Sequence, residues 1–387
     1  MTKLSIFLFK LWYGLSLFSL TIYSYTQIDL NLTLSSHPLY QSIQNQLIFI
    51  GIYQRPFSAY ILTFLLLILF FNYFIILKSL YFRIFKLPDV IHLIAITIVI
   101  LLFSYPAFSY DLFNYIFDAR ILANYHLNPY EYKALDFPGD HWTRFMHWTH
   151  RTYPYGPVWL FLTLPVYFLG FGKFVLTLLN FKLLFSVGYI LSAYLIYTIL
   201  KLLKSKNALF ETAFFALNPL IIIETLVSPH NEIWMLALLL ISLYLLLSKK
   251  KLPAYITLAL SGGIKYLTFT LLPLYYLFIK KKINPHSLVK ITLLALSLLL
   301  VPLIALREAY PWYFITILGL SSLIDKSRFP RLLIIAISAA LLSRYLPFIY
   351  FGDYSALEMS WQNILPFFVL LFTLSLYFLK SKRLFPL

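Results

Sequence analysis

The feature that most constrains the fold is a series of long apolar runs, such as YILTFLLLILFFNYFIILKSL at residues 60–80. Runs of this kind recur along the chain and are separated by short stretches that carry lysine and arginine. A helix needs about 20 apolar residues to cross the hydrocarbon core of a bilayer. Only 12% of the residues are charged, whereas a soluble domain carries roughly 25%. The sequence therefore predicts an all-α, polytopic integral membrane protein.

The apolar runs predict about twelve spans, of which residues 253–279 supply two. Three lysines at 249–251 and three at 280–282 flank this segment, so a single span would place one cluster on each side of the membrane. Two short helices that turn at Gly262 and Gly263 keep both clusters on one side. The other ten spans are expected near 5–25, 57–77, 90–105, 174–200, 210–227, 231–248, 287–305, 311–324, 330–349 and 363–380.

The lysines and arginines also orient these spans, because the cytoplasmic loops of membrane proteins are enriched in both. When both termini are cytoplasmic, the cytoplasmic segments hold 21 of the 31 lysines and arginines. Residues 156–170 then form a short re-entrant helix in the outer leaflet, and the loops at 26–56, 106–155 and 350–362 face outward. The net charge of +17 thus reflects topology, and basic residues dispersed over short loops do not indicate nucleic-acid binding. The first run lacks a small-residue cleavage site, so we expect a retained span.

The outward loop at 106–155 concentrates five of the fourteen acidic residues. A loop of this length is usually functional or disordered, and its aromatic content favours an ordered amphipathic helix at the membrane interface. On that helix Asp111 and Asp118 share a face about 10 Å apart, which is too far to share one proton. Asp111 could instead cap the helix, and Asp118 could be a solvated acid or pair with Arg120. Asp111 adjoins the preceding span and is the stronger candidate for chemistry at a lipid headgroup.

Histidines and a tight turn follow in the same loop. His147 and His150 are three residues apart and could hold a divalent metal, yet HWTRFMHWTHR (141–151) suits an interfacial aromatic belt equally well. The metal stays an open possibility, and no other cofactor is indicated. In the turn RTYPYGPVW (151–159), Arg151 can bind a phosphate in a bidentate manner. Tyr153 and Tyr155 can stack on a sugar or a prenyl chain, or serve only as membrane anchors.

Two further segments place polar groups on the same predicted side. NPLIIIETLVSPHNEIWM (218–235) carries Glu224 within a span and His230 and Asn231 in the turn after it. An ionisable residue inside a span indicates a functional site by default, although Glu224 could instead pair structurally with Lys265 or Lys182.

Lys265 itself is expected at the tip of the helical hairpin, where it could bind a phosphate or extend to the surface. Arg307, in REAYPWYF (307–314), is a further phosphate candidate beside belt-like aromatic residues.

The order of these motifs resembles a known family. SYDLFNYIFDARILANYHLNPY, YPYGPVWLFL, ALNPLIIIETLVSPHNEIWMLALLL, SGGIK and YPWY follow one another over roughly 90–325. They resemble bacterial multispanning mannosyltransferases of the GT-C superfamily, which use polyprenyl-phosphate mannose. The resemblance implies an outward-facing site, a lipid-linked sugar donor and a glycan or glycolipid acceptor. It also implies inverting transfer, with Asp111 as the general base on the acceptor hydroxyl and Arg151, Lys265 or Arg307 neutralising the departing phosphate.

One departure from the wider superfamily concerns the second acid. Many relatives carry two adjacent acids in this loop, whereas Asp111 and Asp118 are seven residues apart, so the role of the second acid and any metal requirement stay open. Alternatives to a glycosyltransferase are another enzyme of lipid-linked glycans, such as a ligase or polymerase, and a lipid or solute transporter. A transporter favours pseudo-symmetric halves, and the sequence shows no internal repeat.

The expected arrangement is one glycosyltransferase domain over 1–387 in the plasma membrane. Its catalytic core spans about 90–325, its outward loop 106–170, and 326–387 form C-terminal helices. The residues expected to bind donor or acceptor beside Asp111 are Asp118, Arg120, Arg151, Tyr153, Tyr155, Glu224, His230, Asn231, Lys265 and Arg307.

Overall fold

The computed structural model describes residues 3–379, and every regular element within that range is a helix. The all-α prediction is confirmed. Six helices are long and apolar enough to cross a membrane, or seven if the bent pair Ala208–Ala216 and Pro219–Val227 forms one span. The structure does not confirm the count of twelve, because the other predicted spans form apolar helices shorter than the roughly 20 residues that a span needs. The last residue of the predicted span 363–380 lies outside the described residues.

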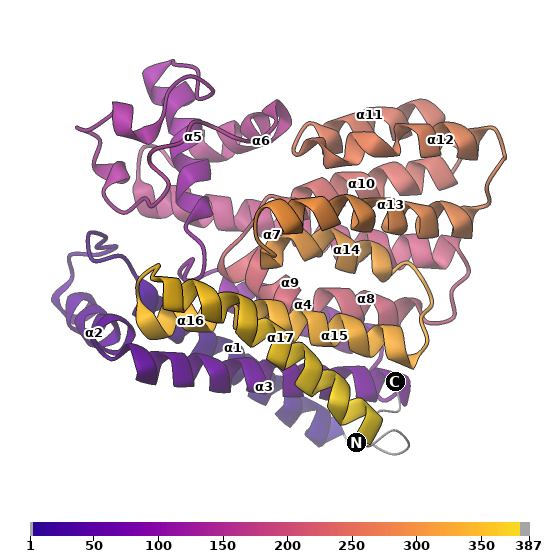
Figure 1. Ribbon diagram of the computed structural model, residues 1–387, viewed down its shortest axis with the longest axis horizontal. Helices are drawn as coiled ribbons and strands as arrows, with labels where there is room; N and C mark the ends of the chain where they lie inside the picture. Colours follow the sequence, from indigo (N-terminus) through magenta and orange to yellow (C-terminus); the bar gives the residue numbers. More distant parts are fainter. Residues whose placement is uncertain (1–2, 380–387) are drawn as a thin grey trace.

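The helices fall into long candidate spans and shorter helices around them (Figure 1). The long ones are α1 (Lys3–Ser24), α3 (Arg55–Tyr81), α7 (Phe174–Leu202), α13 (Pro285–Leu306), α15 (Arg328–Ser343) with α16 (Tyr345–Phe351), and α17 (Ala356–Leu379). The shorter ones in the bundle are α4 (Leu87–Leu101), α8 (Ala208–Ala216), α9 (Pro219–Ile222), α10 (Glu232–Leu247), α11 (Lys251–Gly262), α12 (Leu272–Ile279) and α14 (Phe314–Ser321). Three more, outside the bundle, are α2 (Pro38–Ile48), α5 (Asp111–Tyr125) and α6 (Pro157–Phe168).

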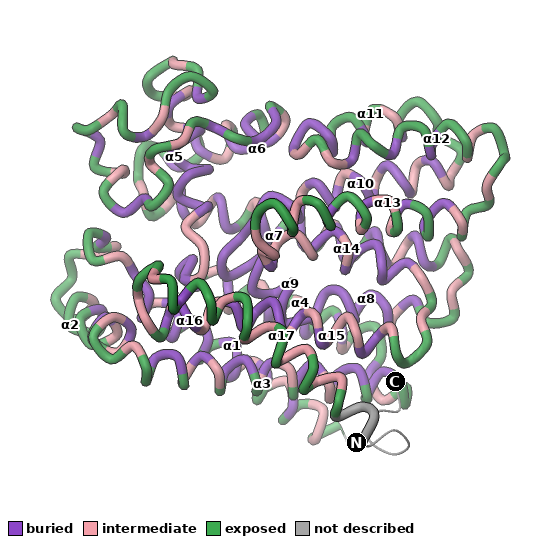
Figure 2. Tube along the Cα trace, in the orientation of Figure 1, coloured by how far each residue is buried: buried purple, intermediate pink, exposed green. Residues whose placement is uncertain are grey.

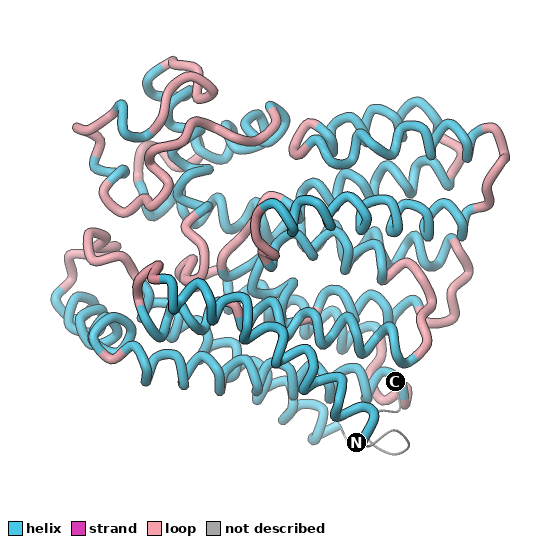
Figure 3. Tube along the Cα trace, in the orientation of Figure 1, coloured by secondary structure: helices cyan, strands magenta, loops and turns pink. Residues whose placement is uncertain are grey.

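The two ends of the bundle differ. α2, α5 and α6 lie at one end, which we call the loop end, and much of the non-helical chain gathers around them (Figures 1 and 3). The links between α7 and α8, between α12 and α13, and between α14 and α15 lie at the opposite end, as do the first turns of α1 and the last turns of α17. The links at this opposite end carry basic clusters, including 201–206 and 280–282.

Local sequence explains the two breaks that the helices make. Asn218 accepts a hydrogen bond from the Leu220 amide and Pro219 occupies the first helical position, so a new helix begins there and the pair bends by 50°. In the predicted hairpin, α11 ends at Gly262 and a 3₁₀ turn (Tyr266–Leu271) leads into α12, which confirms two short helices in place of one span.

The protein has a closely packed interior and an exposed surface that is largely apolar. Figure 2 shows buried chain concentrated along α8 and α10 and exposed chain on α13 and α17. The exposed faces are apolar: on α3, Phe64, Leu67 and Phe71 are 64%, 64% and 59% exposed. Contiguous apolar surface of this extent is rare on water-facing helices. A lipid environment accounts for it.

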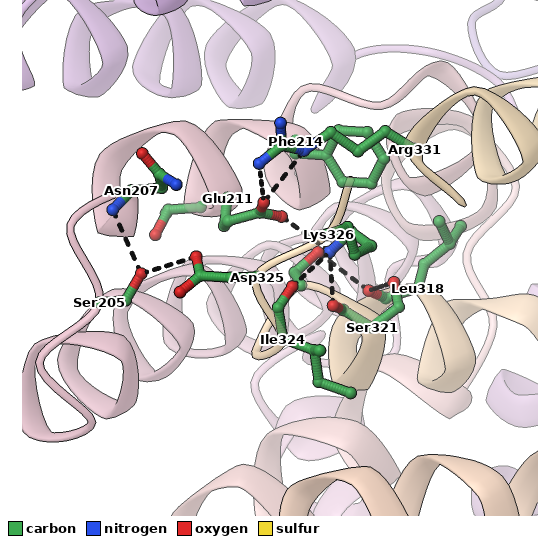
Figure 4. A network of polar contacts seen from close by, with 12 residues as sticks. Ser205, Asn207, Glu211, Phe214, Leu318, Ser321, Ile324, Asp325, Lys326 and Arg331 are labelled. Carbon is green, nitrogen blue, oxygen red and sulfur yellow. Dashed lines mark hydrogen bonds and ion pairs between the residues drawn. The ribbon is translucent and has the colours of Figure 1, made fainter. Parts of the chain in front are cut away.

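A buried ion network at the end opposite the loops fastens α15 to α8 (Figure 4). Glu211 on α8 is fully buried, with Lys326 Nζ at 2.8 Å and Arg331 Nη2 at 2.8 Å from its two oxygens. Asp325 accepts a hydrogen bond from the Ser205 hydroxyl nearby at 3.0 Å. Buried charges are tolerated only when paired in this way, so the network anchors the C-terminal helices to the rest of the bundle.

Candidate active site

Helix α5 presents Asp111 as its first residue, and the N-terminal part of the helix is enclosed by the rest of the protein. Residues 111–119 are buried without exception, so the predicted amphipathic interfacial helix is wrong. The loop that follows α5 folds back over it, and Phe113 packs against Phe145 and Phe174 with ring centroids 5.1 and 6.2 Å apart. The residue before the helix, Tyr110, holds the N-cap position. Asp111 is therefore not the cap, and its carboxylate is available for other contacts.

Two of the predicted site residues meet the Asp111 carboxylate. The Tyr155 hydroxyl donates a hydrogen bond to Oδ2 at 3.2 Å, and Arg151 Nη2 lies 3.4 Å from Oδ1. Tyr153 points elsewhere, since its hydroxyl donates to the Gly156 carbonyl at 3.0 Å. The tight turn at 151–156 thus carries a cation and a phenol to Asp111.

Asp118 and Arg120 have different partners from those that the sequence suggested. Asp118 is buried rather than solvated, and among residues 3–379 no group donates a hydrogen bond to its carboxyl. Burial raises the pKa of Asp118 from 3.8 to about 8; Arg151 opposes the rise and Asp111 adds to it. Arg120 instead pairs with Asp140, Nε to Oδ2 at 2.5 Å, and stacks over Trp142. Arg120 therefore holds the loop at 140–142 against α5.

The histidines of the loop make no metal site in the described chain. His147 stacks on Tyr110 with centroids 3.7 Å apart and lies 3.5 Å from Asp29. His150 lies near Trp148. Within residues 3–379 no three His, Asp or Glu side chains gather closely enough to hold a metal, so a metal on His147 and His150 would lack a third protein ligand there.

Glu224 and His230 belong to a buried polar chain. Glu224 pairs neither with Lys265 nor with Lys182; its Oε2 lies 3.1 Å from His230 Nδ1, and the Tyr345 hydroxyl donates to its Oε1 at 2.8 Å. His230 Nε2 lies 3.1 Å from Ser109 Oγ, two residues before Asp111. This series of polar side chains therefore connects α16 to the start of α5.

Sequence reasoning also missed Glu232, which pairs with Lys265. Lys265 Nζ donates to Glu232 Oε1 and lies 5.3 Å from the ring centre of Tyr155, the phenol that contacts Asp111. Glu232 is 2% exposed. Its position directly after Asn231 in the SPHNE motif could have identified Glu232 as a site residue. An acid in the first turn of an apolar helix is, however, also explained by a favourable interaction with the helix dipole.

Backbone contacts hold the 151–156 turn against the tip of the helical hairpin. The Gly156 amide donates to the Ile264 carbonyl at 2.9 Å, and the Val158 amide donates to the Gly263 carbonyl at 3.0 Å. A Cβ on Gly156 would lie 2.2 Å from the Gly263 oxygen, so only glycine allows this approach. The contact fixes Tyr155 beside Lys265.

The YPWY motif completes one wall of the site. Tyr310, Trp312 and His230 form a ladder of near-parallel rings with centroid separations of 4.5 and 4.2 Å. Arg307 is exposed and carries no recorded ion pair within residues 3–379, whereas the neighbouring Glu308 pairs with Arg344 at 2.6 Å.

Several buried polar atoms on residues of this site have no hydrogen-bond partner in the described chain. They include both side-chain polar atoms of Asn231, Glu232 Oε2, Asn114 Oδ1 and Arg151 Nε. Such atoms are few in folded proteins and each is costly when no water or ligand meets it. Asn231 was a predicted binding residue, and its fully buried amide is the strongest sign that the site accommodates a polar ligand.

The arrangement offers two carboxylates, Asp111 and Glu232, each beside a cation, Arg151 and Lys265 respectively. A carboxylate can accept a proton from an incoming hydroxyl, and the cations can stabilise a departing anion. The site can therefore take up a proton from a hydroxyl and stabilise a departing anion.

Comparison with known proteins adds the family. A family model described as "Alpha-(1->6)-mannopyranosyltransferase, N-terminal domain" matches residues 17–281. This range contains α5, the 151–156 turn, the SPHNE motif and the hairpin, but neither the YPWY motif nor α16. No curated protein and no solved structure matches the chain.

Proposed function

The chain belongs to the alpha-(1->6)-mannopyranosyltransferase family and is a membrane mannosyltransferase, and from this premise we propose its donor, acceptor and mechanism. The donor is a polyprenyl-phosphate-linked mannose and the acceptor is a hydroxyl of a glycan or glycolipid. The family match favours this activity over the transporter and ligase alternatives. The observation that carries the proposal is the set of unpartnered buried polar atoms on Asn114, Arg151, Asn231 and Glu232, residues of the site that holds Asp111.

In the proposed reaction, Asp111 accepts the proton of the acceptor hydroxyl as its oxygen bonds to the anomeric carbon. The bond from that carbon to the phosphate oxygen breaks at the same time, and polyprenyl phosphate departs. A single displacement inverts the anomeric configuration. Tyr155 and Arg151 hold the carboxylate from two directions, which supports its role as an oriented base.

The departing phosphate needs cations. Arg151 and Lys265 line the site and Arg307 is exposed near its rim, next to the aromatic ladder. We propose that these three cations bind the phosphate, and that Lys265 gives up its contact with Glu232 to do so. The unpartnered amide of Asn231 supplies hydrogen bonds to the sugar. His230, whose two ring nitrogens face Glu224 and Ser109, positions the start of α5. No step requires a metal, although one bound with the substrates is compatible with the carboxylates present.

We place the protein in the plasma membrane with both termini cytoplasmic and the loop end outward. The gathering of basic clusters at the end opposite α5 supports this orientation. The chain forms one glycosyltransferase domain whose core extends beyond 90–325, because Tyr345 on α16 contacts Glu224.

Purified protein in liposomes tests the donor. We expect it to transfer radiolabelled mannose from polyprenyl-phosphate mannose to a synthetic mannoside, and not from a nucleotide-linked mannose. Transfer from the nucleotide sugar alone would refute the proposed donor. Repeating the reaction with a chelator settles the metal requirement.

A further inference from the structure

A polar groove at the loop end lies apart from the site around Asp111. It has a volume of about 430 Å³ and is formed by the chain after α1, helix α2 and the π-helical turn Phe49–Tyr53. This volume falls within the range of small-molecule sites, roughly 300–1,000 Å³. The loop that forms it is closed tightly, since a Cβ on Gly51 would lie 1.8 Å from the Thr26 oxygen. Gln44 Nε2 also ties α2 to the Leu32 carbonyl at 2.9 Å.

Half of the residues that line the groove carry neutral amide or aliphatic hydroxyl groups, and the others are Leu30, Ile48, Phe49 and Tyr53. Gln41 and Asn45 are one helical turn apart on α2, and Thr33 also lines the groove. Within residues 3–379 these three side chains make no recorded hydrogen bond. Gln44 is 7% exposed, and its Oε1 has no partner in that range. The groove therefore offers amide and hydroxyl groups that are free to bind a ligand, as both donors and acceptors.

Two aromatic rings stand at the edge of the groove. Phe49 and Tyr53 are stacked with centroids 6.2 Å apart and are 54% and 69% exposed. An interfacial belt would explain exposed rings, but it would not explain three carboxamides beside them. Aromatic rings beside several amides suit a ligand whose C–H groups can pack on the rings and whose hydroxyl groups can hydrogen-bond to the amides.

The lining excludes other ligand classes. None of its residues is charged, although the chain carries a net charge of +17, so a phosphate or an acidic headgroup has no cation to bind. A prenyl or acyl chain would leave the carboxamides buried without hydrogen bonds, which is costly. A neutral polyol is the class that satisfies both the amides and the rings.

The groove is connected to the loop that carries Asp111. The Tyr110 hydroxyl, one residue before Asp111, donates to the Gln27 carbonyl at 2.9 Å, and Asp29 contacts His147 at 3.5 Å. The segment that leads into the groove and the loop that carries Asp111 are therefore packed against each other at the loop end.

We propose that this groove binds sugar units of a saccharide acceptor, remote from the hydroxyl that receives mannose. The proposal rests on the proposed function for the identity of its ligand as an acceptor. Through this second contact, a longer saccharide binds more tightly than a single mannoside.

The test uses the full-length protein and two kinds of measurement. The double variant Gln41→Ala/Asn45→Ala is compared with Gln46→Ala, an exposed carboxamide on the same helix that does not line the groove. Loss of two neutral hydrogen bonds should raise KM for an α-1,6-linked mannotetraose about tenfold, with kcat and the KM of a single mannoside unchanged. The Gln46→Ala variant should behave as wild type.

Binding of the tetraose, measured by calorimetry in detergent, separates this proposal from the proposed function. Tetraose binding that weakens about tenfold in the double variant supports the groove even if no mannosyl transfer is detected. Equal tetraose binding by wild type and the double variant overturns the proposal. An equal rise in KM for both acceptors also overturns it, because it would indicate a general disturbance.

Discussion

Replacing Asp118 with asparagine should stabilise the protein, and increasingly so as the pH rises. The carboxyl is buried without a recorded donor, and its pKa is raised by burial from 3.8 to about 8. Between these values the folded protein retains a proton that the unfolded chain releases, so the unfolded state binds fewer protons and stability falls with pH. Each pH unit in this range lowers the free energy of unfolding by about 1.4 kcal/mol. The loss between pH 5 and pH 7 is therefore about 3 kcal/mol. The asparagine side chain would not titrate, so the variant would escape this loss.

The assay is thermal unfolding in detergent, followed by tryptophan fluorescence at pH 5, 6 and 7. We expect the melting temperature of Asp118→Asn to exceed that of wild type by a margin that widens at each step. Glu131→Gln, which removes an exposed carboxylate of the same loop, should follow the wild-type curve. If wild type and Asp118→Asn lose stability in parallel, Asp118 ionises normally and the reasoning from its burial is refuted.

Other predictions follow from the contacts above. Glu211→Gln leaves two buried cations unpaired and should cost about 3–5 kcal/mol of stability, seen as a lower melting temperature, whereas Asp325→Asn should have a small effect. Gly156→Ala should separate the turn from the hairpin and lower both transfer rate and melting temperature, with Gly139→Ala, which has open space around it, as the control. His230→Ala should lower the free energy of unfolding by about 1–3 kcal/mol and reduce transfer, because it leaves the buried Glu224 carboxylate without its imidazole partner. An unchanged melting temperature and transfer rate would contradict the role given to this polar chain.

The sequence predicted the architecture where one physical rule dominated. Apolar length located the six long candidate spans, and the lysines flanking 253–279 were enough to predict the hairpin at Gly262. The sequence also named Asp111, Arg151 and Tyr155 as candidate site residues, and the structure brings their side chains together, a contact that the sequence did not predict.

The sequence failed where partners depend on tertiary packing. Asp118 and Arg120 are neighbours in the chain, but residues two apart on a helix do not face each other, and Arg120 reaches Asp140 instead. The burial of α5 depends on a loop folding over it, which periodicity cannot reveal. The motif at 218–235 holds two acids, Glu224 and Glu232, and the sequence alone does not show that Lys265 pairs with Glu232.

The central claim is that Asp111 is the base of a mannosyl transfer from a lipid-linked donor. The most direct measurement compares wild type and Asp111→Asn in single-turnover transfer from polyprenyl-phosphate mannose, with Glu131→Gln as the control. General-base catalysis contributes roughly 10²- to 10⁴-fold, so the account predicts a loss of that size for Asp111→Asn, with the melting temperature retained and Glu131→Gln fully active. Transfer by Asp111→Asn at the wild-type rate would contradict the account.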